Sequence, residues 1–345
     1  MIEKANLEVF ADTLLELARK DKDIIVVTSD SRGSGKLTNF GHELPDQIIE
    51  VGIAEQNLVG ICAGLSAVGK KVFGVSPSSF LTARSLEQIK NDIAYSDHPV
   101  TLVGISAGVS YGQLGATHHS IHDIAVLRAI NNINIVVPAD NFETKEVIKS
   151  AINFKHPLFI RFGKKPMTKL HDGDHNFKTK EVIKSAINFK HPLFIRFGKK
   201  PMTKLHDGDH NFKIGSGIKL KSGKDLAIIA TGETVQRAFE ACELLKKINI
   251  NCTLVSMHTI KPFDEEIFLN SISRVKAVIS VEEHSVSGGL GEKCASVMMQ
   301  KNIHLPFKIL GFPDEYMVNG SQKDVLDHYN MSAEKILEIA KKLIK

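Results

Sequence analysis

The chain has 345 residues, of which 43% are hydrophobic and 24% charged, and its formal net charge is +5. This length predicts two domains, and the composition excludes a disordered or fibrous protein. The small, dispersed positive charge gives no reason to expect nucleic acid or membranes as partners, and it is compatible with phosphorylated substrates.

The four cysteines lie in scattered apolar stretches, and no two are spaced as a Cys-x-x-Cys pair. We therefore expect buried free thiols at Cys62, Cys242, Cys252 and Cys294. The amino-terminal residues lack the apolar core of a signal peptide, and no apolar run has the length of a membrane span. These observations predict a protein of the reducing cytoplasm.

In chain order, the amino-terminal part alternates helices with strands that are apolar on both faces. The predicted helices cover residues 7–20, 55–67, 79–95, 121–130 and 141–153. The predicted strands cover residues 24–28, 48–51, 71–75, 100–105, 133–137 and 158–162. This alternation indicates an α/β domain whose parallel sheet is covered on both sides.

A repeat follows. The segment from Thr144 to Lys178 recurs letter for letter from Thr179 to Lys213. Natural repeats diverge and need about three units to bury a core, so two identical copies indicate a recent or engineered tandem duplication. Each copy encodes the end of a helix, a strand and a polar tail. We predict that the first copy fills the sheet and that the second becomes an extended linker, because loop-closure cost grows slowly with length.

A second α/β pattern begins after residues 214–217. Its predicted strands cover residues 226–230, 253–257, 277–281 and 307–310. Its predicted helices cover residues 234–247, 322–329 and 332–344, and another opens at 288–291. We therefore predict a first domain over 1–165, a linker over 166–213 that contains the duplicated segment, and a second domain over 214–345.

The stretch Val51 to Asn57 organises the first domain. A short strand ends at Gly52, a helical pattern follows, and Glu55 falls in the first helical turn. Ligands bind at this edge of open α/β sheets. A carboxylate in the first turn also stabilises the helix dipole, so its position alone favours a purely structural role for Glu55.

The surroundings of Glu55 point to a family. The segment resembles the glutamate motif of the pyrimidine-binding domain in transketolases and 1-deoxyxylulose-5-phosphate synthases. The resemblance continues through Ser79-Phe80, Arg84, Ile93-Ala94-Tyr95 and Gly115-Ala116-Thr117-His118. The second pattern carries the ATG, TIKP, EEH and GGLG segments of the transketolase carboxy-terminal domain in order. The resemblance implies two doubly wound, mostly parallel α/β domains, which form only the second half of a transketolase.

The resemblance also implies roles for single residues. Glu55 matches the glutamate that hydrogen-bonds N1′ of the thiamine diphosphate pyrimidine, which makes it a catalytic and cofactor-binding candidate. Phe80 matches the aromatic ring that stacks on that pyrimidine, although a core phenylalanine would look the same. His118 matches the histidine that faces substrate and thiazolium, which suits proton transfer near neutral pH. A zinc site at His118 and His122 is the alternative, which we do not expect because the next helix starts too late to hold both.

Two positions depart from the family pattern. Where transketolases carry Gly-Glu-Asp-Gly, this chain has Gly-Gln-Leu-Gly, and Leu114 cannot accept a hydrogen bond from a sugar hydroxyl. Ser106 stands where transketolases have a further histidine, so it is a substrate-binding candidate, and the sugar is expected to be unusual. Arg161 and its copy Arg196 are candidates for binding a substrate phosphate, although a surface ion pair explains them equally well.

The family's Gly-Asp-Gly…Asn motif for Mg²⁺ and diphosphate is missing from the sequence. The tail from His171 to His175 resembles it only superficially. In the second domain, Glu282-Glu283-His284 and the glycines at 288–291 look architectural, although a helix start there could hold an anion. A separate amino-terminal subunit is therefore expected to supply the metal and diphosphate site.

The sequence thus predicts the carboxy-terminal subunit of a split transketolase of the cytoplasm, which uses thiamine diphosphate and Mg²⁺. We expect it to self-associate, to form a heterotetramer with the amino-terminal subunit, and to transfer a two-carbon ketol unit between the sugar phosphates of the pentose phosphate pathway. The alternatives are a subunit like 1-deoxyxylulose-5-phosphate synthase, one like the β subunit of 2-oxoacid dehydrogenases, and a non-catalytic paralogue that only binds a partner.

Overall fold

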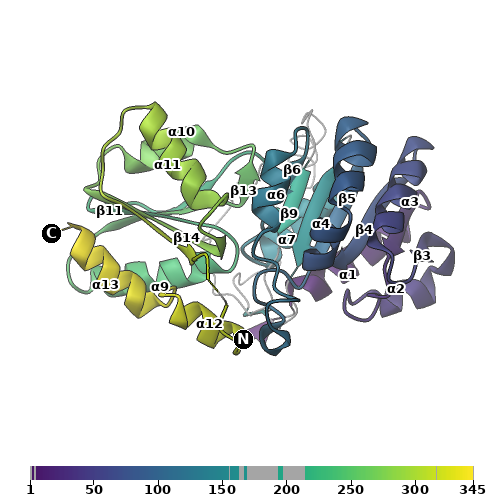
Figure 1. The fold of residues 1–345 in the computed structure, drawn as a ribbon, viewed down its shortest axis with the longest axis horizontal. Helices are drawn as coiled ribbons and strands as arrows, with labels where there is room; N and C mark the ends of the chain where they lie inside the picture. The colour runs from purple at the N-terminus through teal and green to yellow at the C-terminus, as the bar shows by residue number, and fades with distance from the viewer. Residues whose placement is uncertain are drawn as a thin grey trace.

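The computed structural model describes residues 2–3, 5–154, 156–162, 167–168, 193–196, 214–315 and 317–344. They form two α/β units that lie side by side, the amino-terminal one in purple to teal and the carboxy-terminal one in green to yellow (Figure 1). Among the described residues, no helix combines the length and the apolar character needed to cross a membrane.

The first unit begins with the short strand β1 (Ile2–Glu3). Its α-helices are α1 (Asn6–Ala18), α2 (Thr38–Glu43), α3 (Glu55–Ala67), α4 (Ser78–Arg84), α5 (Leu86–Gln88), α6 (Asp123–Ala129) and α7 (Asn141–Ala151). The short helices η1 (Pro45–Gln47) and η3 (Gly112–Leu114) are 3₁₀, and η2 (Ile89–Tyr95) is a π-helix. The further strands are β2 (Ile24–Thr28), β3 (Ile48–Glu50), β4 (Lys71–Pro77), β5 (Val100–Ile105), β6 (Asn134–Val136), β7 (Leu158–Phe162), β8 (Met167–Thr168) and β9 (Leu193–Arg196).

The second unit holds the remaining elements. Its helices are α9 (Thr234–Lys246), α10 (Glu265–Ile272), α11 (Leu290–Gln300), α12 (Gln322–His328) and α13 (Ala333–Ile344). Its strands are β10 (Ile218–Lys221), β11 (Leu226–Ala230), β12 (Cys252–Ser256), β13 (Thr259–Lys261), β14 (Ala277–Ser285) and β15 (Phe307–Phe312).

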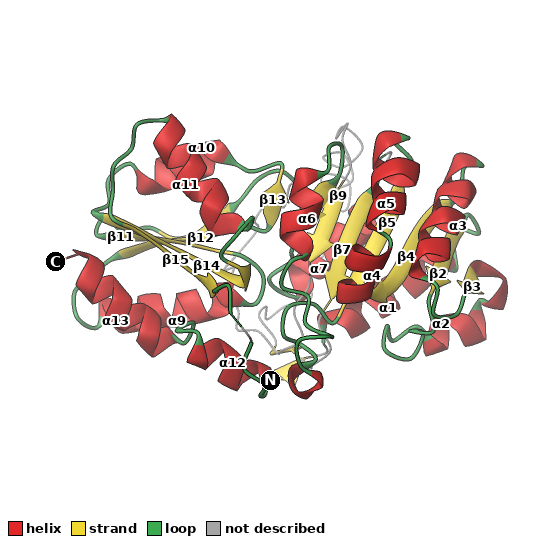
Figure 2. Ribbon diagram, viewed as in Figure 1, coloured by secondary structure: helices red, strands yellow, loops and turns green. Residues whose placement is uncertain are grey.

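Each unit is built on one mostly parallel sheet with helices on both faces (Figure 2). The larger sheet has the order β13-β6-β9-β7-β5-β4-β2-β3, and the smaller has the order β10-β12-β11-β14-β15. Every residue of β2, β5, β11 and β12 is buried, as strands covered on both faces require. The predicted doubly wound α/β fold is confirmed.

The predicted helix over 79–95 is divided in the structure. It consists of α4, α5 and η2, and Ser85 lies at the first break. The Ser85 hydroxyl donates to the Leu81 carbonyl oxygen at 2.5 Å, and the Thr82 hydroxyl donates to the Ser78 carbonyl oxygen at 2.7 Å. Such bonds from serine and threonine to the preceding turn bend helices, which explains the division.

Strand β13 joins the two units. It belongs to the carboxy-terminal part of the chain, yet it pairs antiparallel with β6, so that Thr259 lies opposite Val136. The Val137 amide extends this ladder by donating to the His258 carbonyl oxygen at 2.8 Å. The sequence pattern did not predict this strand, nor α2, α10 and β10.

The repeated segment enters the larger sheet twice. The first copy begins inside α7, whose Asp140 cap accepts a hydrogen bond from the Glu143 amide, and continues into β7. Four residues of the second copy form β9, which pairs with β7 in parallel so that each residue faces its own duplicate. The first copy thus lies in the sheet, as predicted, whereas the prediction that the second copy becomes an extended linker is wrong for Leu193–Arg196, which form a sheet strand beside the first copy. Most of the predicted linker over 166–213 lies outside the described residues, so that linker and the domain limits stay predictions.

All four cysteines are buried and free, as the sequence predicted. Burial raises the pKa of the Cys62 and Cys294 thiols far above the ordinary value. These thiols are therefore packing groups rather than nucleophiles.

Candidate active site

Glu55 is the first residue of α3, after a turn in which Gly52 has a φ of +70°. Its side chain is only 3% exposed, yet it borders an open hollow of about 660 Å³. The Arg84 side chain from the end of α4 is 47% exposed, and its Nη1 atom lies 3.0 Å from each Glu55 carboxylate oxygen. A buried carboxylate thus meets an exposed guanidinium at the wall of this hollow.

Phe80 links Glu55 to His118. It lies one turn before Arg84 on α4, and the Arg84 Cζ atom lies 4.3 Å from the centre of its ring. Phe80 also contacts His118 edge-to-face, with the two ring centres 5.3 Å apart and an angle of 68° between the rings. The structure therefore links Glu55 to His118 through Arg84 and Phe80.

His118 lies in the turn before α6. Its Nδ1 atom is 3.0 Å from the Thr117 hydroxyl, which fixes one side of the ring. Tyr111 packs edge-to-face on the same imidazole at 5.3 Å. Burial raises the pKa of Tyr111, so this neighbour is a neutral phenol near pH 7. Sequence reasoning missed Tyr111, whose signal was its place in the same Gly-rich loop.

The carboxy-terminal unit holds the loop that carries His118. Gly108 has a φ of +60°, and a Cβ atom there would lie 2.4 Å from the Glu283 carboxyl carbon. Glu283 accepts a hydrogen bond from the Val109 amide at 3.2 Å and another from the Gln322 side chain at 2.9 Å. This contact gives part of the EEH segment the architectural role that its sequence suggested.

The other two residues of that segment also have structural roles. Glu282 accepts hydrogen bonds from the Leu290 and Gly291 amides at 2.6 and 2.8 Å. The protein's own carboxylate therefore occupies the start of α11, where the glycine pattern suggested an anion site. His284 accepts from the Ala125 amide at 3.2 Å through Nε2 and donates to the Ser285 carbonyl oxygen, which holds α6 against the carboxy-terminal unit.

The histidines near His118 that the structure describes form no metal-binding group with it. Helix α6 begins at Asp123, so His118 and His122 both precede it, as expected. His119 is buried, its Nε2 atom lies 3.1 Å from the Gly112 carbonyl oxygen, and burial lowers its pKa. Within the described part of the chain, no three His, Cys, Asp or Glu side chains form a group able to hold a metal ion.

The other predicted substrate residues are less well placed. Ser106 follows the end of β5, is 1% exposed and has a φ of +54°, a conformation that is uncommon for serine. Leu114 is 56% exposed in the same loop region. The backbones of Arg161 and Arg196 lie in β7 and β9, and their side chains fall outside the described part of the structure.

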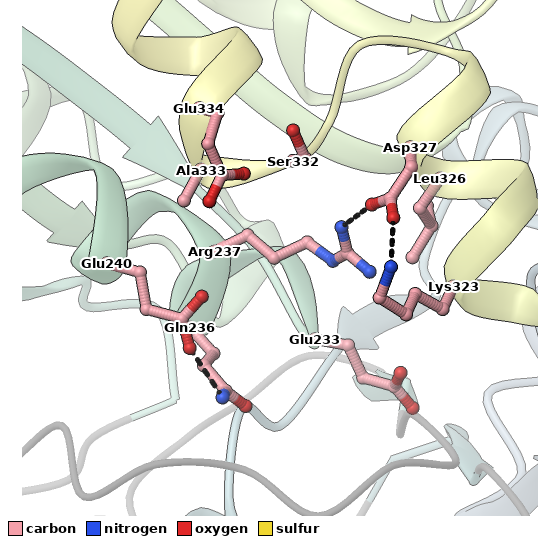
Figure 3. Close-up of a pocket in the computed structure, with 10 residues that line it drawn as sticks. All are labelled: Glu233, Gln236, Arg237, Glu240, Lys323, Leu326, Asp327, Ser332, Ala333 and Glu334. Carbon is pink, nitrogen blue, oxygen red and sulfur yellow. Dashed lines mark hydrogen bonds and ion pairs between the residues drawn. The ribbon is translucent and has the colours of Figure 1, made fainter. Parts of the chain in front are cut away.

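A second hollow, of about 310 Å³, lies in the carboxy-terminal unit between α9, α12 and α13 (Figure 3). Arg237 and Lys323 both reach Asp327 there, at 2.6 and 2.7 Å. Both cations are thus already paired with a carboxylate, and none of the predicted site residues lines the hollow. We therefore place the candidate active site at Glu55.

Models of two protein families match most of the chain. The one described as "Transketolase, pyrimidine binding domain" matches residues 3–169, and the one described as "Transketolase, C-terminal domain" matches residues 215–336. A third, the FMRFamide related peptide family, matches only residues 189–199 and is too short to carry a family assignment.

Individual relatives agree with these matches. The chain is 40% identical to an apulose-4-phosphate transketolase subunit of Phocaeicola vulgatus, over 97% of this chain and 96% of that protein. It is 30% identical to the 1-deoxy-D-xylulose-5-phosphate synthase of Caldanaerobacter subterraneus, over 96% of this chain and 47% of that protein. A solved structure described as "Split gene transketolase, inactive beta4 tetramer" is 30% identical, with a TM-score of 0.78 over 99% of this chain and 98% of that one. The chain belongs to the transketolase family, and it aligns over nearly its whole length with the carboxy-terminal subunits of split transketolases.

Proposed function

We propose that this chain is the catalytic carboxy-terminal subunit of a thiamine-diphosphate-dependent transketolase. The reaction is the transfer of a two-carbon ketol unit between sugar phosphates, and it requires an amino-terminal subunit. The observation that carries the proposal is a chain of contacts between three separate segments: it runs from Glu55, at an open hollow, through Arg84 and Phe80 to His118. A helix-capping role alone does not explain why a buried carboxylate is linked through Arg84 to an aromatic ring.

The residues present fit the pyrimidine half of the cofactor. Glu55 offers a buried carboxylate as a hydrogen-bond acceptor, and Phe80 offers an apolar face for stacking. When bound, thiamine diphosphate supplies a nucleophilic thiazolium carbon that carries the two-carbon unit. Glu55 would hold the ring and share a proton at N1′, while the Mg²⁺ and diphosphate ligands would come from the partner subunit.

His118 is the proposed proton-transfer residue on the substrate side. Thr117 and Tyr111 fix its ring, and the imidazole can take or return a proton from a sugar hydroxyl near neutral pH. Ser106 is proposed to contact the sugar at the far end of the same loop. Arg161 and Arg196 are proposed to bind its phosphate through their guanidinium forks.

The unusual loop points to a substrate outside the pentose phosphate pathway. Leu114 offers no hydrogen bond where other transketolases place an acid, so the sugar differs at the hydroxyl that the acid would bind. The name of the Phocaeicola relative makes apulose 4-phosphate one donor to test. Similarity to 1-deoxy-D-xylulose-5-phosphate synthase favours pyruvate as the second candidate donor.

The proposed assembly is a heterotetramer of two amino-terminal and two carboxy-terminal subunits, with the sites between subunits. The description of the related split-gene structure as an inactive β4 tetramer supports both self-association and the need for a partner. We propose the cytoplasm as its location and regard a partner-binding paralogue without activity, or a subunit like the β chain of 2-oxoacid dehydrogenases, as the remaining alternatives.

A ketol-transfer assay tests the proposal. This chain is incubated with and without a candidate amino-terminal subunit, thiamine diphosphate and Mg²⁺, with xylulose 5-phosphate or apulose 4-phosphate as ketol donor and ribose 5-phosphate as acceptor. Pyruvate, which would donate an acetyl unit with release of carbon dioxide, is tested separately for the synthase-like alternative. We expect turnover only in the mixture and a loss of at least about 100-fold in Glu55→Gln. Glu87→Gln, which removes an exposed carboxylate from α5, is the matched control and should retain full activity. Turnover by this chain alone, or full activity of Glu55→Gln, would overturn the proposal.

A further inference from the structure

Arg84 fills the space between the two groups that the pyrimidine would need. It donates to both oxygens of the Glu55 carboxylate at 3.0 Å, and its Cζ atom lies over the Phe80 ring, 4.3 Å from the ring centre. A guanidinium is planar, donates hydrogen bonds along its edge and stacks on aromatic faces. It therefore satisfies the same carboxylate and the same ring that an aminopyrimidine would use.

We propose that Arg84 is an internal occupant of the pyrimidine site, which has to turn away before the thiamine ring can bind between Glu55 and Phe80. This inference rests on the proposed function, because that function identifies the ligand of Glu55. The Arg84 guanidinium uses both oxygens of the Glu55 carboxylate and lies over the Phe80 ring, so it competes with a pyrimidine for the same two groups.

The exposure of the two partners identifies Arg84 as the one that moves. The Glu55 side chain is almost fully buried at the start of α3, whereas about half of the Arg84 side chain is in solvent. Arg84 is also the last residue of α4, where the helix dipole favours a positive charge in any rotamer. If the Arg84 side chain turns outward, its guanidinium stays hydrated. The same movement opens the hollow that Glu55 and Arg84 both border.

The occupied state stabilises the isolated chain ahead of assembly. A buried carboxylate without a partner is costly, and Arg84 supplies the partner while the site is empty. The same contact competes with the cofactor. The apparent affinity for a ligand is reduced in proportion to the fraction of molecules whose site is open. The free energies of a half-exposed ion pair and of an exposed cation–π contact together would weaken cofactor binding by a factor of about 3 to 30.

Removal of Arg84 should therefore act in opposite directions on two measurements. In the isolated chain, Arg84→Ala should lower the melting temperature by about 2–4 °C, because Glu55 loses its partner. In the complex with the amino-terminal subunit, it should tighten thiamine diphosphate binding by about 3- to 30-fold. Arg84→Gln keeps a side-chain amide donor. Its melting temperature and its affinity for thiamine diphosphate should lie between those of Arg84→Ala and of the unchanged chain. A residue with only a structural role would weaken both properties.

The experiment is calorimetric titration of the apo complex with thiamine diphosphate at fixed Mg²⁺, together with melting curves of the isolated chain. Lys90→Ala is the matched control, since it removes an exposed positive charge from the adjoining π-helix and should change neither measurement. Equal or weaker cofactor binding in Arg84→Ala would overturn the inference and leave the proposed function intact. The absence of any thiamine diphosphate binding in the unchanged complex would overturn the proposed function, and this inference with it.

Discussion

Replacing Gly108 by alanine should disrupt the contact that positions the active-site loop. The new Cβ atom would lie 2.4–2.8 Å from the three atoms of the Glu283 carboxyl group, well inside van der Waals distance. The carboxyl group cannot move freely, because Val109 and Gln322 both donate hydrogen bonds to it. Overpacking costs about 1–3 kcal/mol, and a left-handed backbone costs a non-glycine residue about 1–2 kcal/mol. We therefore expect a loss of about 2–5 kcal/mol in the free energy of unfolding.

Urea unfolding of the isolated chain measures this loss, and Gly60→Ala provides the control. Gly60 lies in the helix α3, and a Cβ atom there would have no neighbour within 4 Å. That substitution should stabilise the chain by up to about 1 kcal/mol, since alanine is the better helix former. The same Gly108→Ala protein should lose ketol transfer in the complex, because the loop carries His118. Equal stability of the two variants would refute the reasoning.

A double-mutant cycle separates the two parts of the cost. If the clash with the carboxylate dominates, Glu283→Ala should make Gly108→Ala less harmful, with a coupling of about 1–3 kcal/mol. If the backbone conformation dominates, the two losses should simply add. Additivity would therefore reassign the role of Gly108 from packing against the carboxy-terminal unit to backbone geometry.

Two further predictions concern ionisable groups that are buried or partly buried. Burial lowers the pKa of His119 below its ordinary value of 6.5, so the folded state favours the neutral imidazole. The stability that His119 contributes is therefore fully present above pH 6.5, and it is lost as the pH falls towards the pKa of the folded state. Urea midpoints measured from pH 7.5 to 5.5 should consequently fall more in the unchanged chain than in His119→Gln, and parallel curves would contradict this. Lys261 donates to the Arg128 and Ile130 carbonyl oxygens at 3.2 and 2.5 Å, so Lys261→Met should lower the free energy of unfolding by about 1–3 kcal/mol. The exposed Lys301→Met should change it by less than about 0.5 kcal/mol, and similar losses in both variants would exclude a specific role for Lys261.

The strands were predictable from the sequence because most are buried on both faces. Residues 24–28, 100–105 and 226–230 have the predicted limits, since an unbroken apolar run has no polar face that could blur its ends. Strand β13 was missed because its three residues have no pattern of their own and pair with a strand of the other unit. The single helix predicted over 79–95 is divided in the structure. The sequence did not show the division, because the side-chain hydrogen bonds of Ser85 and Thr82 do not alter the hydrophobic periodicity.

The site was predictable where a motif fixes a residue and less so where geometry does. Glu55, Phe80 and His118 each lie in a recognisable segment, and the structure gathers all three. The sequence gives Arg84 no role beyond its place in the family segment, because a long polar side chain on this helix could equally face an interface or solvent. Its pairing with Glu55 depends on how α3 and α4 sit on the sheet, which the local sequence does not encode.

The pairing of β13 with β6 has a consequence for the synthesis of the protein. The outer edge of β6 is covered by residues that leave the ribosome long after Asn134–Val136. At typical rates of about 5–20 residues per second, that edge stays uncovered on the order of ten seconds. An open strand edge is a template for pairing with other chains. The first unit therefore depends on the second to close its sheet, and a nascent or truncated chain that ends before Thr259 would be prone to aggregate.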